Sequence, residues 1–210
     1  MPKPEVAIID YGAGNLHNLL NAVESVGGAG EVIKDHSALE TFTHVILPGV
    51  GAFGPASQVL HDSGFARSLH QHVKRRRWLL GVCLGFQLLF SRSEEDGEWG
   101  GLDLLEGNVL SLQRLRTSNS VKIPRVGWAD VSPPKDSRMY RSDEVSSAYY
   151  FVHSYFVAPN QNYSRVGATI FDSTPYCASI EHETIWGTQF HPELSGPDGL
   201  ALLQRFLEQP

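Results

Sequence analysis

Short, continuous apolar runs mark the first half of the chain. The runs at 6–9, 45–47 and 78–82 contain only apolar residues and glycine, and a glycine-containing turn follows each of them. Strands buried on both faces have this composition, because neither face meets water. These runs predict a parallel sheet, to which residues 31–34 add a weaker strand.

Helical periodicity fills the intervals between these strands. The expected helices run from Asn15 to about 27, from 56 to 76 with an interruption near Ser63-Gly64, from 84 to about 90, and from 199 to 207. The last of them is amphipathic and closes the chain. Alternating strands and helices predict an α/β fold with helices on both faces of a mostly parallel sheet.

The pattern changes after residue 102. Short strand-like segments separated by turns cover 109–112, 121–123, 149–155, 166–171, 177–181 and 185–190. They predict an antiparallel portion that extends the parallel sheet or packs on it. The polar stretch 91–101 is expected to be a loop. No linker rich in Pro, Gly or Ser divides the chain, so we expect a single domain over residues 1–210.

Charge and cysteine content narrow the class of protein. A net charge of −6 argues against nucleic acid as a main partner, since phosphates need a basic face. Two cysteines imply no disulfide framework and fit a reducing compartment. The sequence shows neither a signal peptide nor an apolar segment of transmembrane length. These features predict a cytoplasmic protein that makes no use of a membrane.

A candidate nucleophile follows the strand at 78–82. That strand runs into the turn Gly81-Val82-Cys83-Leu84-Gly85, and a short helix follows. Strand, turn and helix in this order form the context of a nucleophile elbow, here with sulfur in place of a serine oxygen. The N–H groups at the helix start favour a thiolate. A buried structural cysteine is the alternative, because free cysteine is often buried.

A candidate base and its carboxylate follow the last predicted strand. His191 and Glu193 flank Pro192, which fixes its own φ and disfavours helix at His191. A cysteine nucleophile needs a base within hydrogen-bond reach, and that base needs a carboxylate or carbonyl to set its tautomer. Cys83, His191 and Glu193 can supply these roles, because all three are predicted at the carboxyl ends of strands.

The remaining histidines and the first glycine loop predict no metal or cofactor. His61, His70 and His72 fall on the long predicted helix, where we expect them at the surface. No paired His/Cys spacing suits zinc. The loop at 12–14 is Gly-x-Gly without the third glycine of a dinucleotide site.

A second glycine-rich loop, at 48–54, follows the strand at 45–47. α/β proteins place ligand contacts at the carboxyl ends of parallel strands. The backbone N–H groups of this loop can face an anion or a developing oxyanion. The alternative is a connecting turn that uses glycine for positive φ.

Several motifs together resemble a known family. The elbow at 81–85 with His191-Pro192-Glu193 is the pattern of class I (triad) glutamine amidotransferases. The more particular stretches are 9–16, 47–53, 88–90 with 93–95, 124–128 and 150–155. In this order they resemble the glutaminase subunits of imidazole glycerol phosphate synthase, an enzyme of histidine biosynthesis. The resemblance covers residues 6–206 and implies a three-layer, flavodoxin-like amidotransferase fold.

The resemblance also implies a role for each matching residue. The catalytic triad would be Cys83, His191 and Glu193. Backbone N–H groups of Leu84 and of Val50 or Gly51 would hold the oxyanion. The substrate-binding residues would be Gly49, Gln87, Glu95, Ser154 and Tyr155, and the residues at a partner interface would be Asn15, Trp128 and Tyr150.

The implied activity is hydrolysis of L-glutamine to glutamate and ammonia through a cysteine thioester. The implied partner is a (β/α)8-barrel synthase subunit (HisF-type), bound as a heterodimer, which uses the ammonia to make imidazole glycerol phosphate and AICAR. Leu194, Ala129 and Arg125 stand where the family usually has Lys, Asn and His, in regions expected to face that partner.

These departures leave an alternative open, in which the same glutaminase chemistry serves a paralogous synthase in surface-polysaccharide or sugar amidation. A stand-alone hydrolase of γ-glutamyl compounds and a binding protein without activity are two further alternatives. The intact set of Cys83, His191 and Glu193 argues against the loss of activity.

Overall fold

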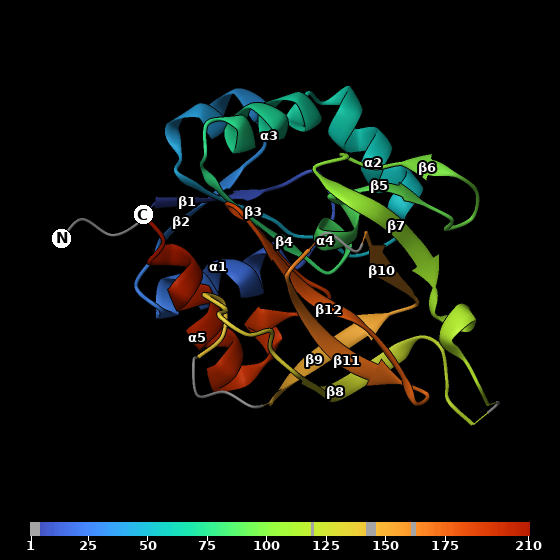
Figure 1. Ribbon diagram of the computed structural model, residues 1–210. Helices are drawn as coiled ribbons and strands as arrows, with labels where there is room; N and C mark the ends of the chain where they lie inside the picture. Colours follow the sequence, from blue (N-terminus) through green and yellow to red (C-terminus); the bar gives the residue numbers. More distant parts are fainter. Residues whose placement is uncertain (1–4, 119, 142–145, 161–162) are drawn as a thin grey trace.

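A computed structural model describes residues 5–118, 120–141, 146–160 and 163–210 (Figure 1). Its main element is a seven-stranded sheet with the order β11-β12-β13-β4-β3-β1-β2. In that order the strands are Arg165–Phe171, Thr174–His182, Ile185–Thr188, Trp78–Val82, His44–Leu47, Glu5–Ile9 and Ala29–Ile33. The strands from β13 to β2 pair in parallel, and β12 and β11 extend them antiparallel. The predicted sheet with its antiparallel extension is confirmed.

Helices cover both faces of this sheet (Figure 1). On one face lie α2 (Phe53–Asp62) and α3 (Phe65–Lys74), and on the other lie α1 (Leu16–Ser25) and α5 (Gly196–Leu207). The short helix α4 (Leu84–Leu88) directly follows β4. The predicted α/β fold with helices on both faces is confirmed.

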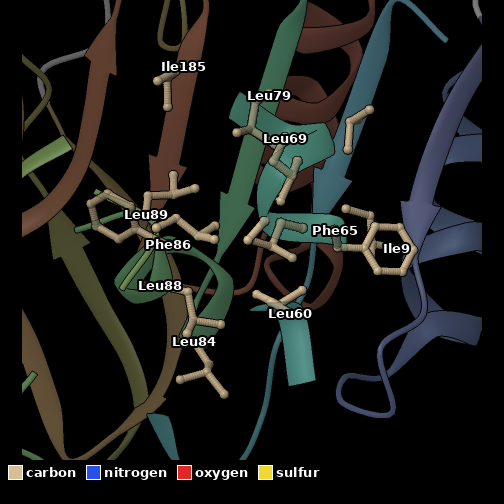
Figure 2. Packing of buried hydrophobic residues seen from close by; sticks show 14 of the residues in the cluster. Ile9, Leu60, Phe65, Leu69, Leu79, Leu84, Phe86, Leu88, Leu89 and Ile185 are labelled. Atoms are coloured by element: carbon tan, nitrogen blue, oxygen red, sulfur yellow. The ribbon is translucent and has the colours of Figure 1, made fainter. Parts of the chain in front are cut away.

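The central strands bury side chains toward both helical layers. On β3, Val45 and Leu47 belong to the core that includes α2 and α3, whereas Ile46 between them belongs to the core that includes α1 and α5. Figure 2 shows the first of these cores, in which Leu60 and Phe65 pack with residues of the sheet. Successive side chains of a strand point to opposite faces, so continuous apolar runs give two cores.

Two smaller sheets complete the fold. The four-stranded sheet has the order β10-β7-β5-β6, with strands Tyr155–Pro159, Leu105–Ser111, Phe90–Ser93 and Trp99–Gly100. The two-stranded sheet pairs β8 (Arg125–Val131) with β9 (Ser147–His153). A β-bridge between Ser132 and Ala168 joins it to the main sheet. Short 3₁₀ helices lie at His36–Thr41, Leu112–Leu115 and Pro192–Leu194.

The long helix predicted at 56–76 is two helices. Gly64 has φ 84, a left-handed conformation that glycine adopts without steric cost, so the chain turns between α2 and α3. The helix predicted from 84 ends at Leu88, and β5 begins at Phe90. The stretch 91–101 is therefore not loop throughout, because it carries most of β5 and all of β6.

One strand predicted in the second half of the chain is wrong, and another is divided into two strands. The segment 121–123 is not a strand, because Val121 and Ile123 pack into a small core and the next residue, Pro124, has no N–H for a ladder. The segment 149–155 is divided at Ser154 into the end of β9 and the start of β10. The two parts pair with different strands, β8 and β7.

The expectation that His72 lies at the surface is also wrong. His61 and His70 are exposed, but His72 is only 3% exposed. Its Nε2 donates to the carbonyl oxygen of Trp78 at 3.0 Å, so the imidazole joins the end of α3 to β4. Its polar character in the sequence gave no sign of this burial.

Candidate active site

Cys83 lies in the sharp turn between β4 and α4. Its backbone has φ 55 and ψ −109, a conformation that residues other than glycine rarely adopt. Gly85 allows the turn, because a Cβ at this position would lie 1.9 Å from the carbonyl oxygen of Leu47. The N–H of Cys83 donates to the carbonyl of Thr188 at 2.8 Å. The turn has the predicted strand–turn–helix geometry and is held between β3 and β13.

His191 enters the site from the neighbouring strand. β13 pairs in parallel with β4 and places Thr188 beside Val82, so both segments leave the sheet at the same edge. Nδ1 of His191 donates to Oε1 of Glu193 at 2.8 Å, and both side chains are almost fully buried. The N–H of His191 donates to the carbonyl of Tyr150 at 2.9 Å, which ties this segment to β9.

The surroundings of His191 favour its protonated form. Burial lowers the pKa of His191, but the interactions with Cys83 and Glu193 outweigh burial and raise the pKa to about 10. Nε2 of His191 is buried and makes no hydrogen bond within the usual limits of distance and angle. The arrangement therefore stabilises an imidazolium beside the sulfur, and its Nε2 can transfer a proton to a departing group.

A cleft of about 280 Å³ opens at Cys83. It is lined by Val50, Gly51, Cys83, Leu84, Gln87, Glu95, Pro124, Val152, His153, Ser154 and Tyr155. All the predicted oxyanion residues belong to this lining, and so do the predicted substrate-binding residues with the exception of Gly49. His191 and Glu193 do not line the cleft. The segments that sequence reasoning joined are thus gathered around one concave site.

Gly49 is buried against the elbow. A Cβ at Gly49 would lie 2.7 Å from both the Tyr11 hydroxyl oxygen and the backbone nitrogen of Gly85. The Tyr11 hydroxyl donates to the carbonyl of Pro48 at 2.8 Å, and burial raises the pKa of Tyr11, so the hydroxyl keeps its proton. The next residue, Val50, is 46% exposed. The loop at 48–51 is therefore fixed at its start and reaches the cleft at Val50 and Gly51.

Two of the lining residues also hold the walls of the cleft together. Oε2 of Glu95 accepts from the N–H of Phe53 at 2.8 Å, at the first turn of α2, and burial raises the pKa of Glu95. Nε2 of Gln87 donates to the carbonyl of Tyr155 at 2.9 Å and to Oε1 of Gln189 at 3.0 Å. These bonds join α4, β10 and the end of β13 below the cleft.

Two residues near the site had no role in the sequence reasoning. His153 lines the cleft; its Nδ1 donates to the carbonyl of Tyr155 at 2.8 Å and its Nε2 accepts from the Tyr176 hydroxyl at 2.9 Å. Burial lowers the pKa of His153 to about 3, so the ring is neutral. Gln189 is completely buried, with Nε2 3.8 Å from Sγ of Cys83. Its position two residues before His191 was the only signal in the sequence.

An exposed apolar face lies on the β8–β9 ribbon. The pairs Val126 with Val152 and Trp128 with Tyr150 stand opposite each other in the register and so share one side of the ribbon. The side chain of Trp128 is 59% exposed and meets Tyr150 edge-on at 6.1 Å between ring centroids. We call these four residues the apolar face. Trp128 and Tyr150, two of the predicted interface residues, thus lie together.

The other residues expected at an interface are more scattered. Asn15 is exposed and caps α1 by accepting from the N–H of Asn18 at 3.3 Å. Leu194 is 38% exposed, and Ala129 is half-buried. Arg125 points away from the apolar face.

The side chain of Arg125 lies on the side of the β8–β9 ribbon opposite the apolar face. It stands opposite His153 in the register, and its guanidinium lies 4.6 Å from the centre of the Phe151 ring. Its Nη1 donates to the hydroxyl of Tyr176 at 2.7 Å. The guanidinium therefore lies on the side of the ribbon opposite the apolar face and supports the floor of the cleft through Tyr176 and His153.

The second cysteine lies apart from the candidate active site. Cys177 is buried in the main core, its thiol donates to the carbonyl of Ser179 at 3.5 Å, and burial raises the pKa of Cys177. Across 5–118, 120–141, 146–160 and 163–210, no three His, Cys, Asp or Glu side chains are grouped so as to hold a metal ion. Within the same ranges, no helix has the length and hydropathy needed to cross a membrane.

The α/β fold, the cysteine elbow and the His–Glu pair have the geometry that enzymes with a cysteine nucleophile require. A sequence model of the family "glutamine amidotransferase class-I" matches residues 7–209. The chain belongs to this family of glutamine amidotransferases.

Curated relatives are similar over almost the whole chain. "Imidazole glycerol phosphate synthase subunit HisH" of Chlorobaculum tepidum is 42% identical over 203 residues, which cover 97% of this chain and 99% of the relative. The protein of the same name from Moorella thermoacetica is 39% identical and covers 97% and 94%. These identities are high enough that the two proteins share the family and the fold with this chain.

Solved structures of low sequence identity share the fold. The structure of PurLQS from Thermotoga maritima has a TM-score of 0.76 at 19% identity and covers 98% of both chains. A crystal structure described as a glutamine amidotransferase has a TM-score of 0.74 at 16% identity, covering 96% of this chain and 97% of the other. At such identities the likeness concerns the fold alone.

Proposed function

We propose that this chain is the glutaminase subunit of an imidazole glycerol phosphate synthase, in histidine biosynthesis. It hydrolyses L-glutamine to glutamate and ammonia. The observation that carries the proposal is the cleft in which Cys83 meets four of the five predicted substrate-binding residues, with the buried His191–Glu193 pair next to it. The names of the curated relatives favour the histidine pathway over sugar amidation. In this proposal residues 1–210 form one amidotransferase domain.

The reaction begins with attack by sulfur. The Sγ of Cys83 adds to the side-chain amide carbon of glutamine, and the imidazolium of His191 gives a proton to the departing nitrogen, which leaves as ammonia. The γ-glutamyl thioester that remains is hydrolysed by a water molecule that His191 deprotonates, and glutamate is released. Glu193 fixes the orientation of the ring and stabilises its charge, as the 2.8 Å bond to Nδ1 allows.

Backbone N–H groups stabilise the tetrahedral intermediate. The N–H of Leu84 lies at the start of α4, and the loop residues Val50 and Gly51 line the same cleft. Loss of one such donor typically lowers the rate by about 10²–10³-fold, because the charge develops only in the transition state. Gln87, Glu95, Ser154 and Tyr155 bind the glutamine. The carboxylate of Glu95 suits the α-amino group of the bound glutamine.

A synthase subunit with a (β/α)8 barrel binds at the apolar face and receives the ammonia. Val152 belongs both to this face and to the lining of the cleft, so a partner seated there covers the mouth of the site. Exposed aromatic residues such as Trp128 are typical anchors of interfaces. We also propose a cytoplasmic location, which the two free thiols support.

Replacement of the nucleophile tests this proposal. We expect Cys83→Ala to abolish glutamine-dependent turnover by the complex while leaving turnover with added ammonia intact, because ammonia bypasses the glutaminase. His191→Ala is expected to give the same pattern. Steady-state assays with each nitrogen source measure both rates.

A matched control tests whether the loss of any cysteine thiol, and not only that of Cys83, stops glutamine-dependent turnover. Cys177→Ala removes the other cysteine, which lies in the core outside the cleft, and is expected to keep glutamine-dependent turnover. Full glutamine-dependent turnover by Cys83→Ala would disprove the assignment of the nucleophile. A chain that binds no synthase subunit but hydrolyses glutamine would point to the stand-alone hydrolase.

A further inference from the structure

Gln189 is a buried amide next to the sulfur of Cys83. It follows β13 directly, its side chain is 0% exposed, and its N–H donates to the carbonyl of Ala178 at 2.8 Å. Its Nε2 lies 3.8 Å from Sγ of Cys83. Gln189 does not line the cleft, so the amide reaches the sulfur from the protein side. This amide takes no part in the proposed steps of glutamine hydrolysis.

Neighbouring bonds fix which end of the Gln189 amide faces the sulfur. The carbonyl of Tyr155 can only accept, so the group of Gln87 that contacts it at 2.9 Å is the NH₂. The second hydrogen of that NH₂ points to Gln189 at 3.0 Å, so the atom of Gln189 that receives it is the oxygen. The nitrogen of Gln189 is then the end that faces Sγ. A flip of either amide would place two donors or two acceptors against each other.

The direction of this bond bears on the state of the sulfur. The neutral thiol donates to the carbonyl of Val152 at 3.8 Å, a contact that the thiolate cannot make. The thiolate can only accept, and the N–H of Gln189 is aimed at it. A hydrogen bond to the charged form of a group favours that form. In an almost fully buried setting this donor also replaces water that the sulfur would otherwise need.

We propose that Gln189 is a positioning residue that holds the Cys83 sulfur as a thiolate, and that Gln87 and the Tyr155 carbonyl keep its amide in the donating orientation. This proposal rests on the proposed function, because it assumes that Cys83 is the nucleophile. The N–H of Gln189 and the imidazolium of His191 together stabilise the negative sulfur before glutamine binds. A residue with this role changes the reactivity of the sulfur and leaves the affinity for substrate alone.

Alkylation of Cys83 by iodoacetamide measures this effect on the full chain. The rate is followed from pH 5 to 10 by mass spectrometry of the peptide that contains Cys83. Gln189→Met has a similar volume but no donor, and we expect it to move the half-maximal rate upward by about one pH unit, as the loss of one hydrogen bond to the charged form would.

A matched control comes from the preceding residue. Thr188 is completely buried, and its hydroxyl donates to the carbonyl of Phe190 at 3.0 Å without contacting the sulfur. Thr188→Val removes a buried hydrogen bond at the same place in the fold, and its pH profile is expected to match the unaltered chain. Circular dichroism and thermal unfolding verify that each variant is folded.

Turnover by the complex gives a second readout. We expect Gln189→Met to lower kcat by about tenfold, equivalent to one hydrogen bond to a charged group, with KM changed less than about twofold. An unchanged pH profile in folded Gln189→Met would overturn the proposal, and so would a loss confined to KM. Failure of the proposed function would be seen separately, as glutamine-dependent turnover by Cys83→Ala.

Discussion

The backbone at Cys83 combines strain with burial. A φ of 55 at a residue with a Cβ costs about 1–3 kcal/mol. This conformation persists here because contacts with the neighbouring segments hold the backbone in place. The carbonyl of Leu47 crowds Gly85, and the carbonyl of Thr188 receives the N–H of Cys83. The strained backbone directs the sulfur out of the sheet, toward the cleft and the N-terminal end of α4.

The buried histidine at position 72 makes stability depend on pH. Its Nε2 is occupied by the Trp78 carbonyl, and its Nδ1 is buried without a partner. Burial lowers the pKa of His72 to about 4, so the folded state keeps the ring neutral while the unfolded chain takes up a proton near its ordinary value of 6.5. Stability from this residue is therefore complete above pH 6.5 and decreases as the pH falls toward 4.

We expect the midpoint of urea unfolding to fall between pH 6.5 and 4 for this reason. His72→Gln keeps a donor for the Trp78 carbonyl but has no titrating group, so the decrease with falling pH is expected to be shallower in this variant. His61→Gln, at an exposed position of α2, serves as the control and should leave the slope unchanged. Equal slopes in all three proteins would show that His72 is not responsible.

At the scale of elements, a pair of glycines leaves the space in which α4 packs against the sheet. Gly81 of β4 and Gly187 of β13 stand side by side in the parallel register. A Cβ on Gly187 would lie 1.9 Å from the ring of Phe86, and one on Gly81 would lie 2.8 Å from the Cα of Phe86. The helix behind the nucleophile can approach the sheet this closely only because neither strand has a side chain there.

Gly187→Ala is therefore expected to displace α4 and the elbow together. Overpacking of this kind costs about 1–3 kcal/mol, and the displaced N–H of Leu84 should lower kcat as well as stability. Chemical denaturation and glutamine-dependent turnover measure the two effects. Gly100→Ala is a suitable control, because no atom lies within 4 Å of a Cβ built there. A stable and fully active Gly187→Ala would show that the packing of α4 does not require a glycine at position 187.

Much of this arrangement could be predicted from the sequence, because it depends on local patterns. Apolar runs determined the parallel strands, and the motif around Cys83 determined the elbow. The break at Gly64 was predicted as an interruption of the helix over 56–76, because the residue type indicated it. The division at Ser154 was not predicted, because it depends on β9 and β10 having different partners far away in the sequence.

The candidate site was likewise predictable from the sequence only where it depends on local motifs. Residues of its lining were found because they lie in recognisable motifs. The orientation of Arg125 was not, since a guanidinium that packs on Phe151 looks the same in sequence as one that faces solvent. Gln189 was likewise missed, because its role depends on bonds to Gln87 and Cys83, from which it is separated by 102 and 106 positions.

For the whole molecule, the apolar face predicts how the subunits meet. We expect Trp128→Ala to weaken binding of the synthase subunit by about ten- to a hundredfold, as truncation of a central aromatic anchor does. Isothermal titration calorimetry measures the affinity directly. Val59→Ala removes an exposed apolar side chain, 42% exposed, from α2 and is expected to leave affinity unchanged. Equal losses in both variants, or none in either, would place the interface elsewhere.

The sheet order has a consequence for the time at which activity begins. β13 is the last strand in the sequence, yet it lies inside the sheet, between β4 and β12. During synthesis on the ribosome, Cys83 emerges long before the strand that brings Gln189, His191 and Glu193, and closing so long a loop is slow. In the proposed function a nascent chain therefore carries the nucleophile without its base, and we expect no hydrolysis of glutamine before the final strand has been inserted.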